Sequence, residues 1–293
     1  MKAFNFYTPK TLTEALDLLN QCKGRATVIA GGTDVVIELT ERQRDTDCVI
    51  NINKLNELRY CKVEDGKVKI GALTTFTELE NDPYIRENVK GLHSCAVHVG
   101  SPQIRNLGTI GGNVVNCSVA GDSPTTFMAL DATVVLQSKA GKREMKLTDF
   151  YANCKKTQIA DDELMTEIYF DAPAKGVATA TMKLGKRKAL VIVVVGLAVL
   201  VEKDDAGNIS RAQVVIGGVS PKPARLPKVE EYLAGKPVSK ATFAPCADLL
   251  SDAVREMIPT RASMPYKKEG VKGVSDKTFG RILADFGLQE GGR

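Results

Sequence analysis

The chain has 293 residues, 43% of them hydrophobic and 26% charged, a balance typical of a folded globular protein with one large or two smaller domains. The 40 basic and 35 acidic residues leave a net charge of +5 without a long basic block, which argues against nucleic-acid binding. Seven cysteines are present, and no two have the Cys-x-x-Cys spacing. This scatter argues against a disulfide scaffold, a zinc site and a self-contained iron–sulfur site.

The sequence shows no feature that would place it in a membrane. Residues 1–10 lack the apolar core of a signal peptide. The longest apolar stretch, residues 189–201, has 13 residues, fewer than the roughly 18 needed to span a bilayer. We therefore expect a soluble, cytoplasmic protein.

The first elements alternate between helix and strand. Thr11 and Glu14 form a capping box, apolar residues then recur at helical spacing, and Gly24 ends the helix. A short apolar run, residues 26–30, predicts a buried strand that leads into a glycine turn. A helix at residues 35–39 and a strand at residues 48–52 complete an α/β arrangement.

The middle of the chain predicts further strands and short helices around a second glycine turn. Alternating residues at 67–71 and 163–170 indicate strands, and residues 133–137 and 144–147 indicate a hairpin across Ala140-Gly141. Helices are expected at residues 76–80 and 92–99, with the glycine turn at 109–113 and a loop at 118–124 leading into one more short helix.

Residues 171–176, which contain Pro and Gly, are a candidate linker. Strand-like runs at 191–201 and 212–219 follow it, and helices are expected at 229–233, 241–258 and 278–286. We therefore predict a first domain over residues 1–173, with lobes of about 1–55 and 56–173, and a smaller α+β domain over residues 174–293.

Two glycine pairs carry the chemistry: Ala30-Gly-Gly-Thr-Asp34 and Thr109-Ile-Gly-Gly-Asn113. Adjacent glycines adopt positive φ freely and let consecutive backbone N–H groups point into one concavity, which suits a phosphate oxygen. Each pair alone is weak evidence, because a single glycine pair is more often a plain tight turn. Together they predict a dinucleotide whose pyrophosphate is gripped from both sides. Neither pair is the Gly-x-Gly-x-x-Gly fingerprint or a P-loop.

With the segment Gly100-Ser-Pro-Gln-Ile-Arg-Asn106, these two segments resemble the FAD-binding subunits of molybdenum hydroxylases, the family that includes nicotinate and xanthine dehydrogenases. The likeness extends from Phe4-x-Phe-Tyr-x-Pro9 through Ile70-Gly-Ala-x-Thr-Thr75 to the C-terminal helices. It implies an α+β fold: a two-lobed FAD-binding domain of the vanillyl-alcohol-oxidase (PCMH-like) type, followed by the smaller C-terminal domain.

The resemblance also implies a set of cofactor-binding residues, and it implies no catalytic or metal-binding residue in this chain. Two segments would bind the FAD pyrophosphate and the adjoining ribityl or ribose groups, and four single residues would lie near FAD. The complete set is Val28, Ile29, Ala30, Gly31, Gly32, Thr33, Asp34, Thr109, Ile110, Gly111, Gly112 and Asn113, with Ser101, Asp122, Met165 and Lys186.

Several of these residues also have a structural interpretation. Asp122 suits the cap of a helix starting near Ser123, Met165 suits a core position, and Lys186 suits a solvated charged turn. Arg105 is interpreted as structural. The only histidines, His93 and His98, lack nearby metal-ligand partners and are interpreted as helix or surface residues.

The chain departs from some relatives at two points. Val99 stands where some members place an aromatic ring over the isoalloxazine, so the sequence does not identify the side chain that shields the flavin. One branch of the family carries an inserted iron–sulfur motif, and the ungrouped cysteines argue against it here.

The resemblance implies an oxidoreductase that carries FAD and relays electrons. A large molybdopterin-binding subunit and a small subunit with 2Fe-2S clusters would be its partners, and NAD(P) or another acceptor would receive the electrons. The substrate would be an N-heterocycle of the nicotinate or xanthine type, bound by the large subunit. Two alternatives remain: a stand-alone FAD reductase of related fold, such as the enolpyruvyl-sugar reductase of cell-wall synthesis, and an assembly module that binds no flavin.

Overall fold

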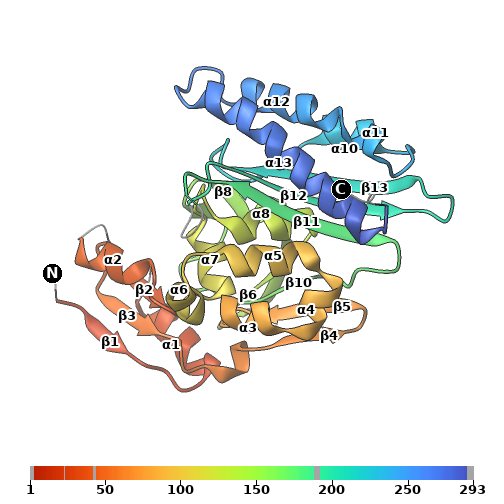
Figure 1. The fold of residues 1–293 in the computed structure, drawn as a ribbon. Helices are drawn as coiled ribbons and strands as arrows, with labels where there is room; N and C mark the ends of the chain where they lie inside the picture. The colour runs from red at the N-terminus through yellow and green to blue at the C-terminus, as the bar shows by residue number, and fades with distance from the viewer. Residues whose placement is uncertain (1–2, 23, 42–43, 188–191, 289–293) are drawn as a thin grey trace.

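The structure, a computed structural model, describes residues 3–22, 24–41, 44–187 and 192–288. Three hydrophobic clusters mark three regions of the chain (Figure 1). Lobe 1 denotes residues 3–55, lobe 2 residues 56–173 and the C-terminal region residues 174–288. Within the described ranges, no helix is long and apolar enough to cross a membrane.

In lobe 1, helix α1 (Leu12–Cys22) packs on a three-stranded parallel sheet of order β1-β3-β2. The Thr11 hydroxyl accepts a hydrogen bond from the Glu14 amide at 3.2 Å, so the predicted helix start is confirmed. Gly24 follows the helix with φ of 78°. The remaining elements of this lobe are β1 (Asn5–Tyr7), β2 (Ala26–Ile29), α2 (Val35–Thr40) and β3 (Cys48–Asn51).

The expectation that β2 is a buried strand is wrong. Only Thr27 in this strand is fully buried, and its apolar residues are partly exposed. β2 is an edge strand of its sheet, and Ala26 and Val28 border a cavity as well as packing against the lobe's core.

Lobe 2 is built on a five-stranded antiparallel sheet of order β4-β5-β10-β6-β7. The predicted hairpin is confirmed, with Ser138 paired to Gly141. The strands are β4 (Cys61–Glu64), β5 (Lys67–Gly71), β6 (Thr133–Ser138), β7 (Gly141–Lys146) and β10 (Leu164–Asp171), with the short pair β8 (Tyr151–Asn153) and β9 (Lys156–Thr157). The helices are the 3₁₀ helix η1 (Asn56–Leu58), α3 (Phe76–Asn81), α4 (Pro83–Asn88), α5 (Lys90–His98), α6 (Pro102–Leu107), α7 (Ile110–Asn116), α8 (Asp122–Ala129) and α9 (Leu147–Phe150).

The C-terminal region contains a four-stranded antiparallel sheet of order β11-β12-β13-β14. Its elements are β11 (Val177–Leu184), β12 (Val195–Lys203), β13 (Ile209–Gly217), β14 (Ala224–Arg225), α10 (Pro227–Leu233), α11 (Lys240–Phe243), α12 (Cys246–Met257) and α13 (Met264–Asp285). Strand β11 was not predicted. The helix expected at residues 241–258 is two helices, because Pro245 interrupts the backbone hydrogen bonds between them.

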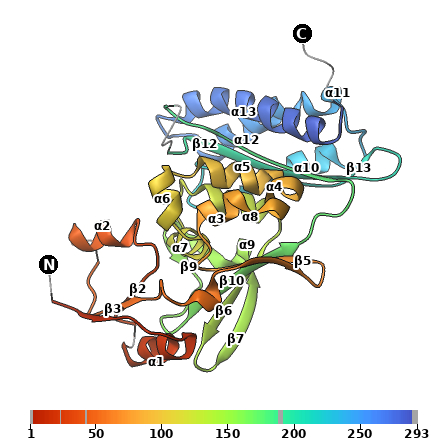
Figure 2. The same cartoon turned by 60° about the horizontal axis from the view of Figure 1, so that its bottom comes forward.

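The layers stack in a fixed order, seen in both ribbon views (Figures 1 and 2). Helices α12 and α13 cover one face of the C-terminal sheet, and α5 and α8 of lobe 2 cover the other. The sheet of lobe 2 lies beyond these helices, and lobe 1 lies to the side. Helices packed on antiparallel sheets confirm the predicted α+β class.

Candidate functional site

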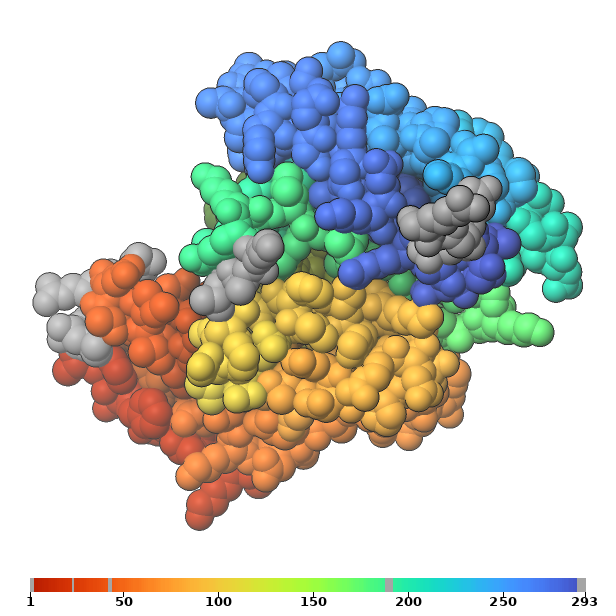
Figure 3. Space-filling view, viewed as in Figure 1, coloured from red at the N-terminus to blue at the C-terminus, as the bar shows by residue number. Residues whose placement is uncertain are grey.

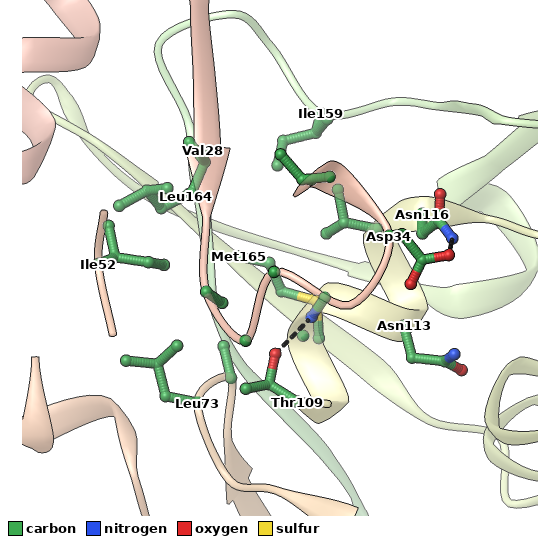
Figure 4. A pocket seen from close by; sticks show the side chains of 18 of the residues that line it. Val28, Asp34, Ile52, Leu73, Thr109, Asn113, Asn116, Ile159, Leu164 and Met165 are labelled. Carbon is green, nitrogen blue, oxygen red and sulfur yellow. Dashed lines mark hydrogen bonds between the residues drawn. The ribbon is translucent and has the colours of Figure 1, made fainter. Parts of the chain in front are cut away.

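A cavity of about 400 Å³ lies where lobe 1 meets lobe 2. Strand β2 and the loop after it line one side, and helix α7 and strand β10 line the other (Figure 4). The space-filling view shows the orange surface of lobe 1 next to the yellow surface of lobe 2 (Figure 3). The site is therefore assembled from residues more than a hundred positions apart in the chain.

The first glycine pair forms the turn that the sequence predicts. Gly32 has φ of 74°, in the left-handed region that favours glycine. Gly31 lies so close to α6 that a Cβ would stand 1.8 Å from the carbonyl oxygen of Leu107. Among the described residues, no acceptor binds the backbone N–H groups of Gly31, Gly32 and Thr33. These three donors therefore remain available to an anionic ligand in the cavity.

The second glycine pair is different, and the expected turn with outward N–H groups is wrong. Thr109 caps helix α7, and Gly111 and Gly112 lie in its first turn without positive φ. The Gly111 amide donates to the Ala72 carbonyl at 2.8 Å, and the Gly112 amide donates to the Thr109 hydroxyl at 3.1 Å. Their donors are already used, so this pair offers the cavity a close-approaching helix N-terminus and no nest.

Glycine at position 111 is required by packing. A Cβ there would lie 2.7 Å from the Ala72 Cβ and 2.8 Å from the Ala72 carbonyl oxygen. At Gly112 a Cβ would meet only the Thr109 hydroxyl, at 2.9 Å. The absence of a Cβ at Gly111 thus lets α7 pack closely against the segment after β5. The absence of a side chain at Gly112 leaves that space to the cavity.

One end of the cavity is polar. The Asn116 side-chain amide donates to the Asp34 carboxylate at 3.0 Å and links α7 to the lobe 1 loop (Figure 4). Asn113 accepts a hydrogen bond from the Ser123 hydroxyl at 2.7 Å. Because this bond occupies the carbonyl oxygen, the Asn113 NH₂ group is left as a donor at this end.

The other end of the cavity is apolar. Aliphatic side chains from both lobes gather there: Val28, Ile52, Leu73, Ile159 and Leu164 (Figure 4). Such a slot suits a flat, weakly polar ring, whereas the polar end suits phosphates and hydroxyl groups. The cavity thus has the two-part character that a dinucleotide requires.

The carboxylate of Glu163 at the rim is neutralised within the protein. Arg143 donates to both of its oxygens, at 2.6 and 2.7 Å, and the Ala160 amide donates at 2.8 Å. The hydrogen bonds from Arg143 lower the pKa of Glu163. This rim carboxylate therefore stays ionised and paired, and it is a poor candidate for a proton donor.

Of the sixteen residues proposed from the sequence, the structure gathers eleven at the cavity. They are Val28, Ala30, Gly31, Gly32, Thr33, Asp34, Thr109, Gly111, Gly112, Asn113 and Met165. Met165 also belongs to the core of lobe 2, in agreement with its structural interpretation. Val99 lines the cavity too.

The other five lie outside the cavity lining. Ile110 is fully buried, and Ile29 lies in β2 beside lining residues. Ser101 caps α6 by accepting from the Ile104 amide at 3.3 Å. Lys186 is exposed. The fifth, Asp122, is the first residue of α8 and contacts Lys183 of β11, with its side chain partly buried.

Asp122 does not cap a helix, so that alternative is wrong. Gly121 is the residue before α8, and the Asp122 carboxylate accepts a hydrogen bond from the Lys183 ammonium at 2.6 Å. Burial raises the pKa of Asp122, while Lys183 acts in the opposite direction. The pair joins lobe 2 to the C-terminal region through an ionic contact with little solvent exposure.

Some lining residues had no signal in the sequence. Ile52, Leu73, Ile159 and Leu164 are apolar residues in or beside strands, a pattern that predicts core packing. No sequence motif indicated Asn116 as a site residue either. Arg105 pairs with Glu80 at 2.9 Å and is structural, as interpreted.

Two family models together match most of the chain. A family model described as the FAD binding domain in molybdopterin dehydrogenase matches residues 2–173. A second model, the CO dehydrogenase flavoprotein C-terminal domain, matches residues 180–282.

Similar proteins cover the whole chain. The nicotinate dehydrogenase FAD-subunit of Eubacterium barkeri is 47% identical, over 97% of each chain. The glyceraldehyde dehydrogenase medium chain of Sulfolobus acidocaldarius is 31% identical, over 95% of this chain and 98% of that one. A solved structure of carbon monoxide dehydrogenase from Hydrogenophaga pseudoflava superposes with a TM-score of 0.88 at 28% identity, over 97% of this chain and 98% of that one.

Proposed function

Because the chain belongs to the family of FAD-binding flavoproteins of molybdopterin dehydrogenases, we propose that its cavity holds FAD and that it is the electron-transfer subunit of such an oxidoreductase. The observation that carries this proposal is the row of unpartnered N–H groups at Gly31, Gly32 and Thr33. These N–H donors lack acceptors within the described protein, and the oxygen atoms of a pyrophosphate can accept their hydrogen bonds.

The residues present fit the cofactor. The polar end, with Thr33, Asp34 and Asn113, matches phosphate and sugar hydroxyls, and the aliphatic slot matches a ring. We assign the family's remaining contacts as proposals at Val28, Ile29, Ala30, Thr109, Ile110, Gly111, Gly112 and Met165, and at Ser101, Asp122 and Lys186.

When bound, FAD supplies the redox chemistry, by accepting electrons from iron–sulfur clusters and passing them to NAD(P) or another acceptor. The chain's own residues bind and orient the cofactor and exclude water from it. The proposed role requires no general acid or base from this chain, and two of its described carboxylates are already paired, Glu163 with Arg143 and Asp122 with Lys183.

The complex we propose has two further kinds of subunit. A large subunit binds molybdopterin and the organic substrate, and a small subunit carries 2Fe-2S clusters. Similarity to a nicotinate dehydrogenase subunit supports an N-heterocyclic substrate, nicotinate- or xanthine-type. We propose the cytoplasm as the compartment of the complex.

The test is a titration of the purified, cofactor-free chain with FAD, followed by flavin fluorescence and by the visible absorbance of the bound flavin. We expect saturable binding. In Gly31→Ala, the new Cβ meets the Leu107 carbonyl and must displace the loop. Its affinity for FAD should fall about tenfold or more, equivalent to about 1.4 kcal/mol.

Gly273→Ala is the matched control, since its Cβ would meet nothing within 4 Å and it lies on α13, outside the cavity lining. Circular dichroism checks that both variants fold. A chain that remains colourless with excess FAD would contradict the proposal and indicate an assembly module. Turnover of a small substrate without partner subunits would indicate a stand-alone reductase.

A further inference from the structure

Helix α2 borders the cavity with little apolar packing, since Leu39 is its only buried apolar residue. It contributes no side chain to the three hydrophobic clusters of the described chain. Two of its apolar residues, Val36 and Ile37, are 52% and 56% exposed. Both ribbon views show α2 at the edge of lobe 1 (Figures 1 and 2). A helix of six residues with a single buried apolar side chain has little stability of its own.

Polar contacts take the place of that packing. The Glu38 carboxylate on α2 accepts a hydrogen bond from the Lys155 ammonium of lobe 2 at 2.8 Å, and its other oxygen pairs with Arg44. Four residues earlier, Asp34 accepts from the Asn116 amide at 3.0 Å. The Glu38 side chain is only 12% exposed, so its charge depends on these partners.

Both lobe 2 partners are anchored to the same end of α7. Asn116 is the last residue of that helix, and Cys117 follows it with φ of 47°. The Lys155 amide donates to the Cys117 carbonyl at 3.1 Å, which fixes the turn that presents the ammonium. The cavity is lined along the length of α7, from Gly111 and Gly112 in its first turn to Asn116 at its end. One helix therefore positions both the cavity wall and the contacts that hold α2.

We propose that the pairs Glu38–Lys155 and Asp34–Asn116 form a clasp that closes α2 and the loop of residues 31–34 over the cavity and sets how fast the bound dinucleotide leaves. This rests on the proposed FAD binding. Closing the clasp holds the three free N–H donors of the loop against the ligand. Opening it frees α2, in which Leu39 is the only buried apolar residue, and the loop moves with the helix. Glu38 and Lys155 are positioning residues, because neither lines the cavity.

The experiment measures FAD release from the full-length chain loaded with FAD. Dilution into a large volume makes release visible as recovered flavin fluorescence. We expect Lys155→Met to speed release about fivefold, because Glu38 loses its partner across the cavity. Salt should speed release from the unmodified chain and have little further effect on the variant. Lys155→Arg should restore slow release.

The matched control is Lys139→Met, which breaks the 2.7 Å ion pair with Asp17 and makes the same change of charge. That pair also joins lobe 2 to lobe 1, but it involves neither α2 nor the cavity lining. Release from this variant should match the unmodified chain. If the unmodified chain binds no FAD, the proposed function fails. If it binds FAD and Lys155→Met releases it no faster than Lys139→Met does, the clasp is overturned.

Discussion

At the scale of single residues, ion pairs within the protein neutralise charged side chains at the rim of the cavity. Glu163 shows this most directly, because Arg143 grips both carboxylate oxygens and only 8% of the Glu163 side chain is exposed. Fork-shaped pairs of this kind are stronger than single-bond surface pairs. The contact also fixes the segment of residues 159–161 at the rim, through the Ala160 amide.

The lowered pKa of Glu163 predicts how this pair responds to acid. A carboxyl whose pKa is lower in the folded state stabilises the fold above its unfolded pKa, and that contribution is lost as pH falls through the folded pKa. Glu163→Gln should therefore reduce the free energy of unfolding by about 1.5 kcal/mol near pH 7. The difference should shrink below about pH 4.

Urea unfolding of both proteins between pH 7 and pH 3 provides the measurement. Glu231→Gln, at an exposed position of α10, serves as the control and should change stability little at any pH. A Glu163→Gln deficit that stays constant across the range would show that the pair does not act through the carboxylate charge.

At the scale of elements, helix α13 differs most from its prediction. The sequence indicates a helix only at residues 278–286, whereas the structure has 22 helical residues, Met264–Asp285. Gly270 and Gly273 in its first half weaken the sequence signal, since glycine disfavours a helix interior. The buried residues Val271, Val274 and Phe279 on one face show that tertiary packing overrides that preference.

Two glycines of α13 give a paired prediction. A Cβ at Gly273 meets nothing within 4 Å, so Gly273→Ala should raise the free energy of unfolding by about 0.5–1 kcal/mol. A Cβ at Gly270 would stand 2.4 Å from a Leu184 methyl group, so Gly270→Ala should gain less or lose stability. Denaturant unfolding of the two variants gives both changes in the free energy of unfolding, and equal changes at the two sites would contradict the prediction.

At the scale of the whole molecule, the C-terminal sheet is shared between two cores. Leu197 and Val199 of β12 pack with the C-terminal helices, and Ala198 and Leu200 pack with lobe 2. This double burial explains why the strand is a continuous apolar run. The boundary between residues 1–173 and 174–293 stays a prediction, and we propose that the two parts unfold together because they share this sheet.

Leu197→Ala tests that coupling. Leu197 is fully buried on the face away from lobe 2, and its truncation should cost about 3 kcal/mol. We expect one transition at lower denaturant, with the same midpoint for backbone circular dichroism and for release of bound flavin. Flavin release at the original midpoint, with circular dichroism shifted alone, would indicate independent domains.

Local features of this protein could be predicted from its residues. The capped helix at Thr11, the hairpin across Ala140-Gly141 and the turn at Gly31-Gly32 follow from neighbouring positions in the chain. The family resemblance, carried by motifs at the two glycine pairs, indicated the fold and the flavoprotein family. In each case the deciding interactions lie within a few residues, so periodicity and backbone preference suffice.

The tertiary structure alone decided what those residues do together. Gly111 and Gly112 became the start of a helix because the Thr109 hydroxyl and the Ala72 carbonyl take their amide hydrogens, and only Gly31-Gly32 kept its donors free. The apolar slot and the contacts of α2 with Asn116 and Lys155 join distant segments. Such pairings depend on how the lobes pack, and no local pattern in the sequence encodes that packing. The capped helix and the glycine turn, in contrast, depend on neighbouring residues and could be predicted from the sequence alone.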